Sequence, residues 1–98
     1  MGKPGTTKNR KIARDICVVN TLGLHARPAS LLAKLASKYR ADITVRKGND
    51  EVNAKSIMGI ITLAASQDAV LHFTASGPDA EPAIAAIVEL IEGKFGEE

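Results

Sequence analysis

A proline inside a helical pattern is the strongest constraint on the fold of this chain, and Pro28 is such a residue. From residue 26 to about residue 38, apolar side chains recur at spacings of three and four, which predicts one buried face of a helix. Because proline has no backbone N–H to donate, a helix tolerates it only in the first turn. Pro28 therefore predicts a helix that begins directly after His25.

Apolar and polar residues alternate in four short segments, a pattern typical of half-buried strands. The Gly-Asn pair at 48–49 predicts a tight turn, so the two strands beside it are expected to form a hairpin. His72 falls on the polar side of the last segment and is expected to be solvent-exposed and without function. The four strands are expected at about residues 12–19, 43–46, 51–54 and 69–76.

Two further helices are expected. Ser56 precedes the short apolar run 57–61, and serine is a common N-cap. A last helix carries a stripe of branched apolar residues and ends at Gly93. The order is thus βαββαβα, which predicts an α+β fold: an open-faced β-sandwich in which a four-stranded antiparallel sheet carries three helices on one face.

A chain of 98 residues suffices for one hydrophobic core. Residues 1–11 lack apolar periodicity and are rich in Gly, Lys, Thr and Pro, so we expect a disordered basic tail before a single domain over residues 12–98. Outside the tail the chain is close to neutral, and it has only one Tyr, two Phe and no Trp. These features argue against nucleic-acid binding and favour a solvated tail.

Cys17 is the only cysteine, so it has no partner for an intrachain disulfide and no companions for a zinc site. This usage fits a reducing, cytoplasmic location. No apolar run approaches the roughly 20 residues that cross a bilayer, and no signal peptide is recognisable. Neither a metal nor a cofactor is expected.

His25 is the first candidate for chemistry, because a helix start presents unpaired N–H groups and partial positive charge that attract anions. That charge opposes protonation of an imidazole held there, and the neutral ring is the form that attacks phosphorus. Arg27 follows two residues later, and its planar fork suits phosphate oxygens. The alternative is a structural histidine beside a surface arginine.

Ser56 has two interpretations. It is either a plain helix cap, or a hydroxyl whose phosphorylation would add charge to the surface while the helix dipole tolerates it. Ile57, Met58 and Ile61 cannot all face the core of so short a helix, so part of this group is expected to be exposed and available to a partner, unless it is ordinary core packing. Lys34 and Lys55 could add a positive rim that suits an acidic partner.

Two stretches carry a resemblance to a known family: GLHARPAS at residues 23–30 and NAKSIMGI at residues 53–60. Over about residues 12–92 the chain resembles the HPr family, the histidine-containing phosphocarriers of the bacterial phosphoenolpyruvate-dependent sugar phosphotransferase system. The family's phosphorylated histidine matches His25, and its regulatory serine matches Ser56. The extension of about ten residues at the start and the Gly48-Asn49 order in the turn depart from the common family pattern.

The resemblance implies a non-enzymatic, monomeric phosphocarrier with the open sandwich fold. It implies that His25 accepts a phosphoryl group on Nδ1 from enzyme I and passes it to an enzyme IIA component, with Arg27 as the phosphate clamp. It further implies that HPr kinase/phosphorylase modifies Ser56, and that the patch of Ile57, Met58 and Ile61 docks enzyme I. Two alternatives stay open: a phosphocarrier of the nitrogen-related branch, and a regulatory binding module that acts through phosphorylated Ser56.

Overall fold

The computed structural model describes residues 11–96. The tail expected over residues 1–11 lies outside this range except for Lys11, which opens the first strand. The elements are β1 (Lys11–Cys17), α2 (Ala26–Ala36), β2 (Asp42–Lys47), β3 (Asp50–Asn53), α3 (Ile57–Thr62), β4 (Val70–Ser76), α4 (Ala80–Glu92) and a final 3-10 turn, η1 (Lys94–Gly96).

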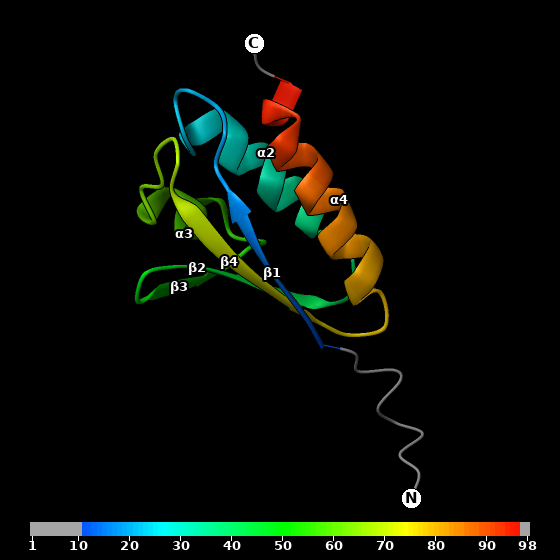
Figure 1. Cartoon of the computed structure of the whole chain (residues 1–98). Coiled ribbons are helices and arrows are strands. Elements are labelled where there is room, and N and C mark those ends of the chain that lie inside the picture. Colours follow the sequence, from blue (N-terminus) through cyan, green and yellow to red (C-terminus); the bar gives the residue numbers. More distant parts are fainter. Residues whose placement is uncertain (1–10, 97–98) are drawn as a thin grey trace, which may run out of the picture.

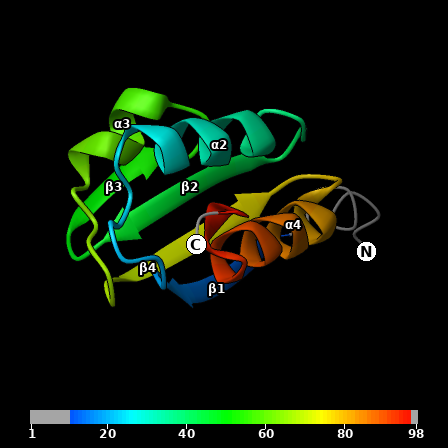
Figure 2. The same ribbon diagram turned by 90° about the horizontal axis from the view of Figure 1, so that it is seen from above.

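The four strands form one antiparallel sheet in the order β1-β4-β2-β3, so the two strands in the middle are β4 and β2. The helices lie on one face of this sheet and leave the other uncovered (Figures 1 and 2). Helix α4 packs over β1 and β4, while α2 contacts both α3 and α4. The predicted open-faced α+β sandwich and its βαββαβα order are confirmed.

The core lies between the sheet and the helices. Alternate residues of the two central strands are fully buried, as the period-two pattern predicted. Burying an aliphatic or aromatic side chain of this size contributes about 1.5–3 kcal/mol each before the entropy of ordering is counted. The largest buried side chains are Phe73, Leu32, Ile43, Ile60, Leu71, Ile84, Ile87 and Ile91.

The predicted hairpin is present, with Lys47 opposite Asp50 and a loop of two residues between them. Gly48 has a φ of +62°, and glycine at the first central position of a two-residue loop is the requirement of a type II′ turn. The Gly-Asn order therefore fits a type II′ turn in this hairpin, whereas a type I′ turn would prefer Asn-Gly.

His72 differs from its prediction. Its side chain is only 33% exposed, and its Nδ1 lies 2.5 Å from Oδ1 of Asp15, its antiparallel neighbour on β1. The alternation placed His72 on the polar face correctly, but a period-two pattern carries no information about which side chain lies across the strand pair. The cross-strand carboxylate accounts for the difference.

Asp79 connects the start of α4 to the loop before β2. Its Oδ2 accepts the Arg40 N–H and its Oδ1 accepts the Ala41 N–H, each at 2.8 Å. The Arg40 N–H is the main reason that the pKa of Asp79 lies below its usual range, because this bond favours the charged carboxylate. Asp79 is also the N-cap residue of α4, yet its carboxylate serves the loop before β2 instead of the helix.

Candidate functional site

The site forms where the chain enters α2. His25 is the N-cap residue, with extended backbone angles (φ −78°, ψ −169°), and its carbonyl accepts the Ala29 N–H at 3.0 Å. Its imidazole makes no capping bond to the helix. The N–H groups of Ala26 and Arg27 have no carbonyl one turn earlier to bond, and Pro28 has no N–H at all. The helix start that Pro28 predicted is therefore present, with two backbone donors left for an incoming anion.

The charge at this helix start is uniformly positive, because the first turn of α2 contains no acidic residue. Arg27 is exposed, and within residues 11–96 its guanidinium makes no hydrogen bond or ion pair. The helix dipole adds partial positive charge at the same place. Arg27 is thus held close to two backbone donors and can turn its fork toward a bound anion.

The imidazole of His25 is half-buried, and its Nε2 atom is fully buried. The ring forms part of an open hollow of about 310 Å³ whose walls are mostly apolar. The other residues that line it come from the loop before α2 and from the end of α3 and its exit: Leu22, Leu24, Ile61, Ala64, Ala65 and Ser66. A reacting group would therefore approach His25 across an apolar surface.

Ser56 is the N-cap of α3, as its sequence position predicted. Its Oγ accepts the Gly59 N–H at 3.0 Å, and its carbonyl accepts the Ile60 N–H at 3.0 Å. The side chain is half-buried. The hydroxyl therefore already stabilises a helix of only six residues, whatever else happens at this position.

Helix α3 buries one of its apolar side chains and exposes others, so the expectation that they cannot all face the core is confirmed. Ile60 is the buried one, whereas Ile57 is 43% exposed and Met58 is 68% exposed. Ile61 is half-buried in the hollow beside His25. Leu22, at 72%, is the most exposed large apolar residue of the described chain; no periodicity pointed to it, because it lies in a loop.

The two lysines of the expected positive rim do lie together. Lys34 and Lys55 line one groove of about 310 Å³, with Ile57 at its edge. The Nζ of Lys55 donates to the carbonyl of Tyr39 at 2.9 Å. This bond connects the segment just before α3 to the loop between α2 and β2. Helix α3 consequently borders both this groove, through Ile57, and the hollow of His25, through Ile61.

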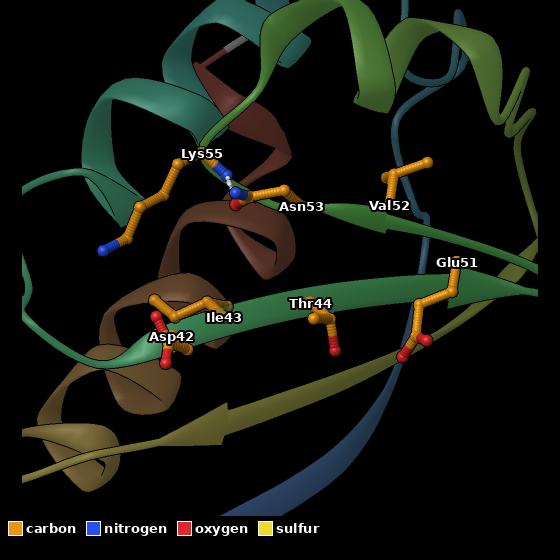
Figure 3. Close-up of a pocket in the computed structure, with 7 residues that line it drawn as sticks. All are labelled: Asp42, Ile43, Thr44, Glu51, Val52, Asn53 and Lys55. Carbon is orange, nitrogen blue, oxygen red and sulfur yellow. Dashed lines mark hydrogen bonds between the residues drawn. The ribbon is translucent and has the colours of Figure 1, made fainter.

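A third hollow, of about 380 Å³, lies over β2 and β3 and is also lined by Lys55 (Figure 3). Its polar groups mix the carboxylates of Asp42 and Glu51 with the amide of Asn53, whose Oδ1 accepts the Lys55 N–H at 2.8 Å. Neither His25 nor Ser56 lines it. It is separate from the site at α2.

Residues 11–96 contain no group of three or more His, Cys, Asp or Glu side chains that could hold a metal ion. Over the same residues, no helix combines the length and the apolar character that crossing a bilayer requires.

Comparison with known proteins gives a consistent result. The family model described as "PTS HPr component phosphorylation site" matches residues 12–93. Phosphocarrier protein HPr of Xylella fastidiosa is 41% identical over 87 residues, which cover 89% of this chain and 98% of that protein. Phosphocarrier protein NPr of Shewanella violacea is 38% identical over 87 residues, covering 89% and 96%.

Solved structures agree. The crystal structure of HPr-C-His from Thermoanaerobacter tengcongensis is 53% identical, with a TM-score of 0.86, and covers 89% of this chain and 98% of its own. The family model spans most of the chain, including all of the βαββαβα unit except its first residue, Lys11, and both candidate positions, His25 and Ser56. This chain belongs to the HPr family: it is a phosphocarrier protein of the phosphotransferase system and not a catalytic enzyme.

Proposed function

We propose that His25 accepts a phosphoryl group on Nδ1 from enzyme I, which draws it from phosphoenolpyruvate, and passes it to enzyme IIA components for sugar uptake. One observation carries this proposal: a histidine stands at a helix start whose backbone donors are uncovered and whose first turn has no acid. Nε2 is buried, and the family resemblance assigns the phosphoryl group to Nδ1, the other ring nitrogen. The proposed place of action is the cytoplasm, a reducing location that fits a chain with Cys17 as its only cysteine.

The transfer needs no group beyond this arrangement. Nδ1 of the neutral ring attacks phosphorus, the new N–P bond forms, and the bond from phosphorus to the donor group of enzyme I breaks. Charge on the phosphoryl oxygens is met by the N–H groups of Ala26 and Arg27 and by the Arg27 guanidinium. Transfer to enzyme IIA is the same displacement in the opposite sense. Donors preorganised in this way are worth about a hundredfold to a thousandfold in rate.

Partner docking is assigned to the apolar side chains of α3 beside the histidine. Ile57 and Met58 are exposed and Ile61 lines the hollow of His25, so a partner seated on α3 is within reach of the ring. Lys34 supplies positive charge next to Ile57, and Lys55 does so in part, since its ammonium also bonds the Tyr39 carbonyl. An acidic partner surface would complement this rim.

Ser56 is proposed as a regulatory position, phosphorylated from ATP by an HPr kinase/phosphorylase. Its hydroxyl lies at the start of α3, where the helix dipole favours negative charge. A phosphate there retains oxygens that can accept the Gly59 N–H while it adds charge beside the docking residue Ile57. A regulatory binding module that acts through phosphorylated Ser56 would use the same change and is compatible with phosphoryl transfer at His25.

The experiment for the main proposal is intact mass measurement after incubation with enzyme I and phosphoenolpyruvate. One added phosphate is expected, labile in acid and missing in His25→Ala. No added phosphate, with an enzyme I shown to be active on another HPr, would overturn the proposal. Adding ATP and an HPr kinase to the same protein tests Ser56, with Ser56→Ala as the control.

The second candidate, a carrier of the nitrogen-related branch, is favoured by the similarity to the protein named NPr at 38% identity. Transfer from the phosphorylated chain to a sugar-specific enzyme IIA and to a nitrogen-branch enzyme IIA, measured side by side, distinguishes the branches. Faster transfer to the sugar-specific partner is expected. The reverse order would assign the chain to the other branch.

A further inference from the structure

We propose that Asn20 is a positioning residue for His25: its buried amide holds the loop that delivers the histidine to the start of α2. The inference rests on the proposed phosphoryl transfer at His25. No pattern in the sequence indicated Asn20, which lies between β1 and the GLHARPAS stretch.

Asn20 is only 1% exposed, and it is the single polar or charged residue that is buried among residues 11–96. Its Nδ2 donates to the carbonyl of Gly23 at 2.8 Å, and the Gly23 N–H donates back to the Asn20 carbonyl at 3.2 Å. Loops usually keep their polar side chains in water, and a buried amide is costly unless it is hydrogen-bonded. The loop is thus organised around this side chain.

The two ends of the loop are tied to one neighbouring segment, the connection from α3 to β4. At the near end, Val18 exchanges backbone hydrogen bonds with this segment: its N–H donates to Ala69 at 2.9 Å, and its carbonyl accepts from Asp68 at 2.8 Å. At the far end, the Leu24 N–H donates to Ala65 at 2.8 Å. Between these ties, the Asn20 side chain sets the path of the loop.

Gly23 is the residue whose carbonyl the Asn20 amide binds. Its φ is +72°, and a Cβ at this position would lie 2.5 Å from the Ala65 carbonyl oxygen and 2.8 Å from the Ser66 Cα. Only a glycine lets the loop lie so close to the α3–β4 connection. With the Gly23 carbonyl held by Asn20 and the Leu24 N–H held by Ala65, the next residue, His25, has little freedom in its backbone position.

Phosphoryl transfer depends on such placement, because a displacement of about 1 Å at a reacting group can reduce a rate by about a hundredfold. Removing the Nδ2 donor frees the Gly23 carbonyl and lets the loop shift, while the docking residues of α3 stay in place. The expected signature is a loss in kcat of about tenfold to a hundredfold with KM within about twofold, since docking is unchanged and placement is not.

The test uses the full chain with enzyme I and phosphoenolpyruvate, and varies the concentration of the carrier. Asn20→Ala removes the amide, and Asn20→Asp keeps its shape but replaces the donor with an oxygen, so the second variant serves if the first does not fold. Asp79→Ala is the matched control: it loses two hydrogen bonds to a loop, but at the opposite end of the sheet from His25.

A second readout is independent of enzyme I. The chain has two histidines, so the imidazole resonances of His25 can be followed by NMR with His72 as an internal reference. In the Asn20 variants the His25 resonances should move while those of His72 stay, and in Asp79→Ala the His25 resonances should stay.

Two results would overturn the inference: a folded Asn20 variant with wild-type kcat and unmoved His25 resonances, or an equal loss of kcat in Asp79→Ala. If the wild-type chain accepts no phosphate at all, the proposed function fails instead. The NMR comparison then still decides whether Asn20 positions His25.

Discussion

Helices α2 and α3 begin in opposite ways. At α3, the hydroxyl of Ser56 accepts the Gly59 N–H and completes the cap. At α2, the imidazole of His25 makes no capping bond, and the exposed Arg27 adds charge to an already positive end. The comparison indicates that the proposed reactive position lies at the helix start without a side-chain cap. The proposed regulatory position lies at the helix start whose side chain already caps it.

The largest effect expected from this contrast is on transfer at α2. Arg27→Ala should slow phosphorylation by enzyme I about a hundredfold, because it removes the side-chain donor for the phosphoryl oxygens. Arg27→Lys should recover part of the rate, since lysine keeps the charge but not the planar fork. Lys38→Ala, which removes an exposed cation just after the same helix, is the control. Equal rates for Arg27→Ala and Lys38→Ala would remove Arg27 from the site.

The next effect is on stability, and it should be found at α3. Ser56→Ala loses the cap, which typically costs about 1 kcal/mol and lowers the midpoint of thermal unfolding by about 4–8 °C in a domain of this size. Ser56→Asp retains an N-cap oxygen and should stay near the wild type. His25→Ala loses no capping bond and should also stay near it. If His25→Ala is as damaging as Ser56→Ala, the two helix starts are not different in the way described.

The third helix start, that of α4, should show its contribution as a pH dependence of stability, because the Asp79 carboxylate there bonds the loop before β2. Because its folded pKa lies below its unfolded value of about 4, Asp79 stabilises the protein above that pH, and the contribution disappears as the pH falls through the folded pKa. Thermal midpoints at pH 6 and pH 3 should therefore differ less for Asp79→Asn than for the wild type. Asp50→Asn, in the exposed hairpin, should keep the wild-type difference.

The smallest expected effect concerns the exit of α3. Ala64 has a φ of +51°, a conformation that costs about 1–2 kcal/mol for a residue with a Cβ. Ala64→Gly relieves this strain but adds freedom to the unfolded chain, so a net gain of about 0.5 kcal/mol is expected in urea unfolding. The same change at Ala85, exposed in the middle of α4, should cost about 1 kcal/mol. A loss at both positions would show that Ala64 is not strained.

Local rules in the sequence predicted much of the fold and of the site. Pro28 located the start of α2, Ser56 located that of α3, and the alternation around Phe73 identified the buried face of the sheet. Each of these depends on neighbours within one turn or one strand. They could therefore be inferred without knowing how the chain folds back on itself.

The features that were missed depend on segments far apart in the sequence. Asp79 bonds residues 40 and 41, Lys55 bonds the carbonyl of Tyr39, and His72 meets Asp15 across a strand pair. Asn20 bonds a residue only three positions away, but its burial comes from the surrounding fold. No periodicity encodes such contacts, because they arise when loops pack against one another.

The uncovered face of the sheet has a practical consequence for measuring these interactions. Cys17 is the only cysteine of the chain; it is exposed at the end of β1 and alternates with the buried Ile16 and Val18, so it lies on the side away from the helices. A thiol-reactive fluorophore attached there would leave His25 and α3 clear. The protein therefore carries its own single attachment point for following the arrival and departure of each partner in real time.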